Sequence, residues 1–146
     1  MNIALISHER KRNLLIRFCE AYCTVLKKHT LFSTEDFGNM ISSVVGKSVS
    51  TFLKGNRGGY QQIAAKIACN EIDLLVFLKD PFIDVKEETR EGEVERLCDL
   101  HAVPSATNIA TAEAVILGLE RGDLDWRNVM NSDSLSKLDK LKSISA

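Results

Sequence analysis

The sequence contains no apolar run that approaches the roughly 18 residues needed to span a bilayer. It also lacks a basic excess, because its net charge is −1, whereas a general nucleic-acid-binding protein is normally basic. These two absences argue against a membrane span and against nucleic acid as a partner. Residues 2–7 form a short apolar run followed at once by charges, which is unlike a signal peptide. We therefore expect a cytoplasmic protein.

A C-x-x-C pair is absent, although the sequence has four cysteines. All four lie in segments with a regular apolar spacing, which favours reduced core residues over disulfides or metal ligands. The sequence therefore predicts no metal site. The four cysteines are Cys19, Cys23, Cys69 and Cys98.

The length of 146 residues is that of one ordinary domain. A hydrophobic fraction of 45% and a charged fraction of 27% are typical of a soluble globular protein. We predict a folded domain over 1–130 and a polar tail over 131–146, since the last residues are rich in Ser, Lys and Asp.

Strand-like and helix-like segments alternate along the chain. This alternation predicts an α/β fold, a single three-layer domain whose mostly parallel sheet carries helices on both faces. Residues 82–90 are expected to be a polar loop, and Asn108 or Thr111 is expected to cap the last long helix. Strands are predicted at 2–7, 30–33, 49–53, 72–78 and 103–107, and helices at 10–28, 38–45, 60–70, 91–101, 112–121 and 123–130.

Ligands bind such sheets beyond the carboxyl ends of the strands. In the glycine-rich stretch 54–59, Lys54 and Arg57 lie next to a predicted helix start. Positive side chains at a helix N-terminus favour binding of an anion. The glycine content fits a plain surface turn equally well. The bases at 10–12 lie at the same edge, where positive charge opposes a helix dipole. The glycine-rich stretch is not a Walker phosphate-binding loop, because the spacing G-x-x-x-x-G-K-[ST] is absent. Residues 84–99 carry seven acids against three bases, which indicates a solvated helix face.

Two further polar residues follow predicted strands. His8 is a candidate catalytic group or a satisfied polar residue at a strand end. Asp80 is a candidate functional acid or a turn former before Pro81. The other histidines, His29 and His101, lie at helix ends and are expected to be structural.

Five runs of residues in order resemble the methylglyoxal synthase family over about residues 2–130. They are 3–8 (IALISH), Gly38-Asn39, Gly55 with Gly58-Gly59 and Gln61-Gln62, 72–81 (IDLLVFLKDP) and 104–113 (PSATNIATAE). The resemblance implies a compact α/β domain that assembles as a cytosolic homohexamer. It also implies conversion of dihydroxyacetone phosphate to methylglyoxal and phosphate, through proton removal by a carboxylate and without a cofactor or metal.

Carried over by position, the resemblance assigns phosphate binding or catalysis to several residues. His8 and Asp80 are kept, Glu9 replaces an aspartate, and Arg12 replaces a phosphate-binding lysine. Thr34 keeps the first hydroxyl of a phosphate-binding run. The implied phosphate-binding set is Arg12, Thr34, Lys54, Gly55, Gly58 and Gly59.

Other positions differ from the family's pattern. Tyr60 stands where the family has its catalytic aspartate, and a phenol ionises near pH 10. Lys54 replaces a phosphate-binding serine, and Glu35 and Asp36 stand in the hydroxyl run. An alignment without gaps places Glu87 at the family's catalytic histidine and Arg90 at its second aspartate.

These differences leave three hypotheses. We favour a binding protein for a phosphorylated or other anionic small molecule with weak or lost lyase activity. The alternative is an active methylglyoxal synthase that uses Glu87, Glu88 or Asp80 together with His8. The third is a structural or regulatory subunit.

Overall fold

The computed structural model describes residues 1–83 and 85–130, and the side chains of all of these except 85–90, 129 and 130. Five parallel strands form one sheet in the order β3-β2-β1-β4-β5. Their bounds are β1 Asn2–Ser7, β2 Thr30–Thr34, β3 Val49–Phe52, β4 Leu74–Leu78 and β5 Ser105–Ala106. The predicted α/β fold with a parallel sheet is confirmed. The predicted tail, 131–146, lies outside the described residues.

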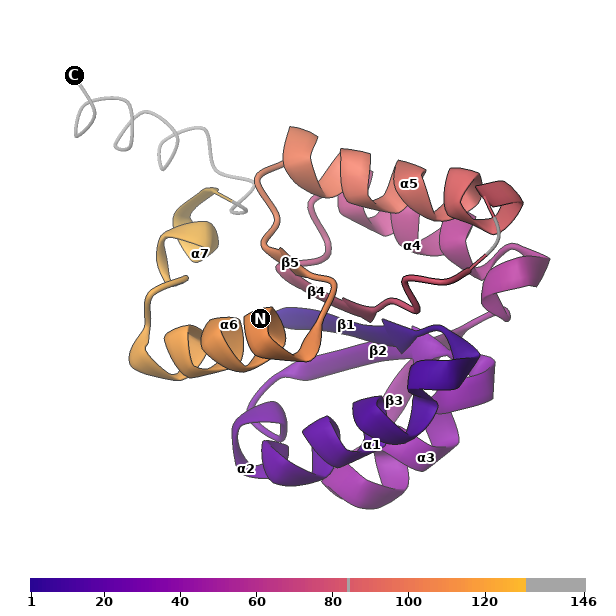
Figure 1. Cartoon of the computed structure of the whole chain (residues 1–146). Coiled ribbons are helices and arrows are strands. Elements are labelled where there is room, and N and C mark those ends of the chain that lie inside the picture. The colour runs from indigo at the N-terminus through magenta and orange to yellow at the C-terminus, as the bar shows by residue number, and fades with distance from the viewer. Residues whose placement is uncertain (84, 131–146) are drawn as a thin grey trace.

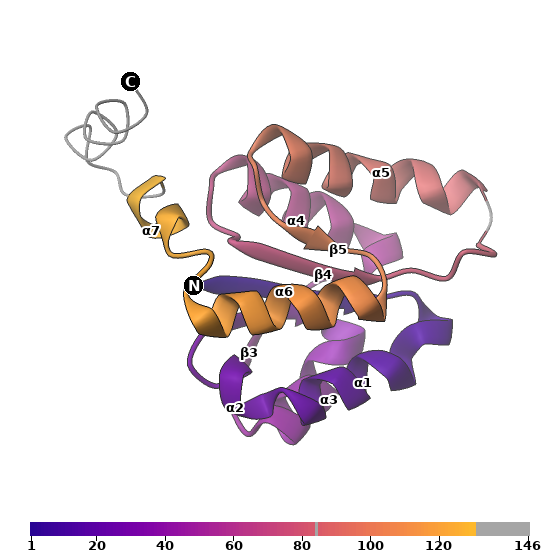
Figure 2. The same cartoon turned by 60° about the vertical axis from the view of Figure 1, so that its left-hand side comes forward.

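Helices cover both faces of the sheet (Figures 1 and 2). One face carries α1 (Arg12–Ala21), α2 (Cys23–Leu26), α3 (Glu35–Val45) and α6 (Ile109–Arg121). The other face carries α4 (Gly59–Ala68) and α5 (Val85–Leu100). Short 3-10 turns precede two helices, η1 (Glu9–Lys11) and η2 (Gly55–Arg57), and α7 spans Trp126–Met130.

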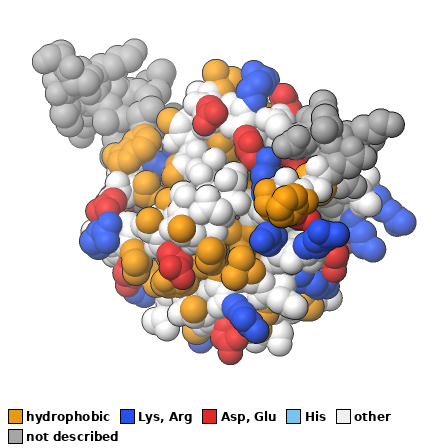
Figure 3. Space-filling view, viewed as in Figure 1, with side chains coloured by type: hydrophobic (Ala, Val, Ile, Leu, Met, Phe, Trp, Pro, Cys, Tyr) orange, Lys and Arg blue, Asp and Glu red, His pale blue; other side chains and the backbone are white. Residues whose placement is uncertain are grey.

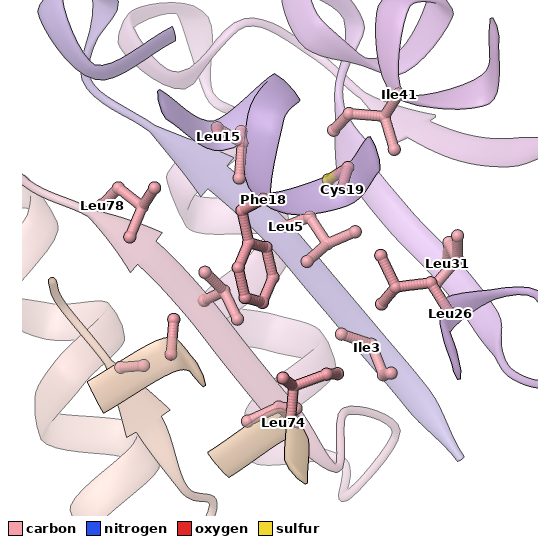
Figure 4. Close-up of a cluster of buried hydrophobic side chains, with 14 of the residues drawn as sticks. Ile3, Leu5, Leu15, Phe18, Cys19, Leu26, Leu31, Ile41, Leu74 and Leu78 are labelled. Atoms are coloured by element: carbon pink, nitrogen blue, oxygen red, sulfur yellow. The ribbon is translucent and has the colours of Figure 1, made fainter. Parts of the chain in front are cut away.

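Alternation along the central strands divides the core into two layers. Ile3 and Leu5 of β1 point to the α1 side with Phe18, whereas Ala4 and Ile6 point to the α4 side. Figure 4 shows the first layer, in which Leu15, Phe18 and Cys19 of α1 pack against β1, β2 and β4. β1 and β4 are therefore buried on both faces, as expected of central parallel strands.

Several predicted element bounds were wrong, and three of them concern helices near the carboxyl ends of the strands. The helix predicted over 10–28 is divided into η1, α1 and α2. α3 begins at Glu35 rather than Gly38, since Glu35 and Asp36 occupy its first turn, where negative charge is favourable. α5 begins at Val85 rather than Glu91. The sequence pattern missed this start because the first turns of α5 carry charged residues without an apolar period. Asn108 caps α6 by accepting a hydrogen bond from the Thr111 amide at 3.0 Å.

The four cysteines are all free thiols, but the prediction that all lie in the core was wrong. Cys19 and Cys98 are buried, Cys23 is half-buried and Cys69 is exposed. Cys69 follows the last residue of α4, and it lies off the stripe formed by Ile63 and Ile67 that packs on the sheet. No helix in the described ranges is long and apolar enough to cross a membrane.

Thiol reactivity tests this arrangement. Burial raises the pKa of both Cys19 and Cys98 to about 12, and Asp99 and Glu95 add to the effect at Cys98. At pH 8 we expect Ellman's reagent to label Cys69 first and to label Cys19 and Cys98 only after unfolding, since the thiolate is the reactive form. Cys69→Ser should abolish the fast phase. Rapid labelling of all four thiols in the folded protein would contradict the packing.

Candidate functional site

A cleft of about 790 Å³ lies at the carboxyl ends of the central strands. β1 lies between β2 and β4, so the chain order reverses beside it, which is where ligands bind in open parallel sheets. The cleft brings together seven of the residues predicted from the sequence: His8, Arg12, Thr34, Lys54, Gly55, Tyr60 and Asp80. Gly58 and Gly59 do not line it.

The charges in the cleft are mixed. Three cationic side chains and four carboxylates line it, so the cleft is not a positive funnel. In Figure 3, Lys and Arg side chains gather toward the right of the view, with acidic side chains among them. The seven charged residues are Glu9, Arg10, Arg12, Asp36, Lys54, Asp80 and Glu91.

His8 directly follows β1 and is 5% exposed. Its Nδ1 accepts the Asp80 amide N–H at 2.7 Å, so the proton of the neutral ring is on Nε2. Nε2 lies 2.5 Å from Glu91 Oε1, to which it donates. The ring edge also rests on Phe77. Both imidazole nitrogens are therefore engaged within the protein.

Glu91 is the site residue that sequence reasoning missed. It lies on α5, is 2% exposed, and lines the cleft beside His8. Its Oε2 is buried without a hydrogen-bond partner among the described residues. The acidic stretch was interpreted as a solvated face, but Glu91, Val94 and Cys98 share a helical spacing and are all buried. That spacing was the available signal.

Asp80 closes a turn as well as lining the cleft. Its Oδ1 accepts the Phe82 amide N–H at 3.0 Å, and its Oδ2 lies 3.6 Å from Nε of the exposed Arg10. The turn-forming role considered for Asp80 is therefore present in the structure. This turn uses Oδ1 of Asp80, so its Oδ2 is left facing the solvent-exposed Arg10.

Arg12 is held in the cleft by several contacts. Its guanidinium donates to the Asp36 carbonyl at 2.9 Å and to Glu9 Oε2 at 3.2 Å, and it lies over the Phe37 ring. The guanidinium thus has a fixed position at the start of α1. Glu9 is largely exposed, so its carboxylate can give way to another anion at small cost.

Thr34 precedes the first turn of α3 and is buried. Its side chain makes no capping hydrogen bond, although the residue occupies the N-cap position. Asp36 lines the cleft in the same turn, and its Oδ1 is buried without a partner in the described part of the chain.

The glycine-rich turn fits tightly against Tyr60. A Cβ on Gly55 would lie 2.4 Å from the Tyr60 ring, and a Cβ on Gly59 would lie 2.1 Å from the Leu53 carbonyl oxygen. Gly58 has a φ of 108°, which side chains rarely adopt. The Tyr60 ring stacks on Phe77 at 5.5 Å between centroids. The turn therefore positions a phenol, not a carboxylate, at the cleft.

The remaining candidates lie elsewhere or beyond what the structure describes. The side chains of Glu87 and Glu88 fall in the undescribed part of α5. Lys54 is exposed at the rim of the cleft. Within residues 1–83 and 85–130, no group of three or more His, Cys, Asp or Glu side chains is arranged to hold a metal.

Comparison with known proteins gives a consistent result. No family model matches the chain. Methylglyoxal synthase of Caldicellulosiruptor saccharolyticus is 48% identical over 143 residues, which cover 98% of this chain and 99% of that protein. Methylglyoxal synthase of Geobacillus thermodenitrificans is 45% identical over 140 residues, 96% of this chain and 97% of that protein. This chain belongs to the methylglyoxal synthase family.

A solved structure supports the same assignment. The crystal structure of methylglyoxal synthase from Elizabethkingia anophelis matches with a TM-score of 0.69 and 32% identity, covering 79% of this chain and 76% of that chain. The resemblance to methylglyoxal synthases and the α/β fold drawn from the sequence are both confirmed. The roles of individual residues stay predictions.

The hydrogen bonds of His8 predict its tautomer. In ¹⁵N-labelled protein at pH 8, we expect a pyridine-type shift for Nδ1 and a pyrrole-type shift for Nε2, because Nδ1 accepts and Nε2 donates. A long-range ¹H–¹⁵N correlation spectrum measures both, and His8→Gln identifies the resonances. Two pyrrole-type nitrogens, or the reverse tautomer, would contradict this geometry.

The tight packing of the glycine-rich turn before α4 leads to a second prediction for this methylglyoxal synthase family member. Gly59→Ala should lower the free energy of unfolding by about 1–3 kcal/mol, because its Cβ would collide with the main chain. Gly92→Ala on α5 is the matched control, since nothing lies within 4 Å of its Cβ. The control should be neutral or stabilising by up to about 1 kcal/mol. Equal urea denaturation midpoints for the two variants would refute the contact.

Proposed function

We propose that this methylglyoxal synthase family member binds a small phosphorylated molecule of the dihydroxyacetone phosphate class and eliminates phosphate weakly or not at all. The observation that supports this proposal is that both ring nitrogens of His8 are already hydrogen-bonded within the protein. Nδ1 accepts from the Asp80 amide, and the Nε2 proton is donated to Glu91. A neutral imidazole that stabilises an enediolate needs a free N–H, and here none is free.

The base is the second requirement of the chemistry. Proton removal from carbon needs a positioned carboxylate or another group of suitable pKa within hydrogen-bond reach. Tyr60 places a phenol beside Gly55, stacked on Phe77. Asp80 is engaged by the Phe82 amide and Arg10. These contacts support binding without efficient turnover.

Arg12 is the anchor we propose for the phosphate. Its guanidinium is fixed over Phe37 and by the Asp36 carbonyl, so little side-chain entropy is lost when it pairs with an anion. Thr34 lines the same side of the cleft, and Lys54 and Gly55 line the glycine-rich turn. A phosphate at Arg12 would take the place of the exposed Glu9 carboxylate.

An active methylglyoxal synthase is the second candidate, and a specific observation favours it. The carboxylates of Asp80 and Glu91 both lie in the cleft next to His8. A substrate that displaced Glu91 from Nε2 would gain a free imidazole N–H and a nearby carboxylate. Glu87 or Glu88 would be further bases in this case.

The test measures turnover and binding separately. We expect phosphate release from dihydroxyacetone phosphate to be at least about 100-fold slower than with the Caldicellulosiruptor saccharolyticus relative under the same conditions. Inorganic phosphate should still bind in calorimetry. Arg12→Gln should weaken that binding by about tenfold to a hundredfold, because a charge-assisted hydrogen bond is lost.

Arg17→Gln is the matched control, because Arg17 is exposed on the same helix and does not line the cleft. Turnover close to that of the relative, reduced by Asp80→Asn or Glu87→Gln, would establish the active synthase instead. Absence of binding to phosphate and to dihydroxyacetone phosphate would leave a structural or regulatory subunit.

We also propose a cytoplasmic homohexamer, as the family resemblance implies. Exposed apolar side chains on the described surface support self-association, among them Leu117 on α6 and Leu100 at the end of α5. Light scattering of the purified protein measures the assembly directly.

A further inference from the structure

The Glu91 carboxylate depends on His8 for its hydrogen bonding. Its Oε1 accepts the Nε2 proton of His8 at 2.5 Å, and its Oε2 is buried without a partner among the described residues. Val94 and Cys98, on the following turns of α5, are fully buried against the sheet. The main chain at position 91 is therefore held beside the end of β1, and the carboxylate is held with it.

The hydrogen bond between His8 and Glu91 is costly to break. A ligand in the cleft could accept the Nε2 proton only by displacing Glu91 Oε1 from it. The carboxylate would then be buried with no donor on either oxygen, which is unfavourable for an ionised group. The other ring nitrogen offers no substitute, because Nδ1 accepts from the Asp80 amide.

The oxygens of a ketone substrate compete poorly with Glu91 for this proton. Hydrogen bonds to an ionised acceptor are roughly twice as strong as those to a neutral one, so a carbonyl oxygen is the weaker acceptor. An enediolate oxygen is ionised, but it would develop beside the charge of Glu91, and like charges repel strongly in a site of low dielectric constant. Glu91 is therefore favoured as the acceptor before and during proton abstraction.

We propose that Glu91 is a positioning residue that suppresses turnover by keeping the Nε2 proton of His8 from a bound substrate. Glu91 acts through His8, because its own free oxygen is too buried to meet a ligand. The proposal rests on the proposed function, since it requires a phosphorylated molecule in the cleft. It adds the residue that controls the fate of that molecule.

Variants at position 91 separate the loss of the acceptor from other effects. Glu91→Ala removes the acceptor and leaves space continuous with the cleft, which the Glu91 side chain lines. Glu91→Gln keeps the shape and a carbonyl acceptor for Nε2. Glu91→Leu also removes the acceptor and extends the buried stripe of Val94 and Cys98, so it replaces Glu91→Ala if that variant does not fold. Glu93→Ala is the matched control, because Glu93 pairs with Arg96 on the exposed face of α5.

The Nε2 proton of His8 gives a direct readout in ¹⁵N-labelled protein. We expect saturating dihydroxyacetone phosphate to leave its resonance unchanged in the wild-type protein and in Glu91→Gln. In Glu91→Ala the same ligand should shift it, because the freed N–H can donate to the ligand. The main-chain amide of Arg12 should shift in all of these proteins, since phosphate is proposed to bind there.

Phosphate release from dihydroxyacetone phosphate is the second readout. Loss of one hydrogen-bond donor to a developing oxyanion typically lowers kcat by about 100-fold or more. We expect Glu91→Ala to raise kcat by at least about tenfold with little change in KM, because it restores such a donor while Tyr60 remains a phenol. Glu91→Gln and Glu93→Ala should keep the wild-type rate.

The outcomes distinguish two failures. If the ligand binds and shifts the Nε2 resonance of the wild-type protein, Glu91 yields its proton and the proposal is refuted, while the binding function stands. The same conclusion follows if kcat does not rise in Glu91→Ala or Glu91→Leu, or if it rises equally in Glu91→Gln. If dihydroxyacetone phosphate shifts no resonance in any variant, the proposed binding function is refuted as well.

Discussion

Beyond the ladder between β1 and β4, the buried His8 residue links the carboxyl ends of both strands to α5. The main-chain N–H of His8 donates to the Leu78 carbonyl at 3.0 Å, and its Nδ1 accepts from Asp80. Its Nε2 reaches across to α5 through Glu91. Because the ring is buried, leaving either nitrogen unpaired would be unfavourable, so its orientation is fixed by the fold. His8 and Glu91, the two ends of this connection, both line the cleft.

The same connection sets the chemistry of the cleft. Arg12 presents a cation from the face that carries α1 and α3, whereas Glu91 presents an anion from the face that carries α5. The sheet holds these groups on either side of β1, and neither neutralises the other through a direct contact that the structure shows.

The fold could be predicted from the sequence because its signals are local. The apolar run around Leu74–Leu78 and the spacing of Leu15, Phe18 and Cys19 each determine one element and its buried face. The rule that ligands bind beyond the carboxyl ends of parallel strands then selected the loops that carry His8 and Asp80. Glu91 could not be placed in the same way. Its role depends on where α5 begins, and the first turns of α5 have charges but no apolar period.

The Tyr60 ring packs directly against Gly55, where no larger residue would fit. The phenol ring fills the space that any side chain at 55 would need, and it also covers Phe77. A smaller acidic side chain at 60 would leave a void above Phe77 and would still meet His8 paired with Glu91. A carboxylate at position 60 would therefore still leave both His8 nitrogens hydrogen-bonded, one to the Asp80 amide and one to Glu91.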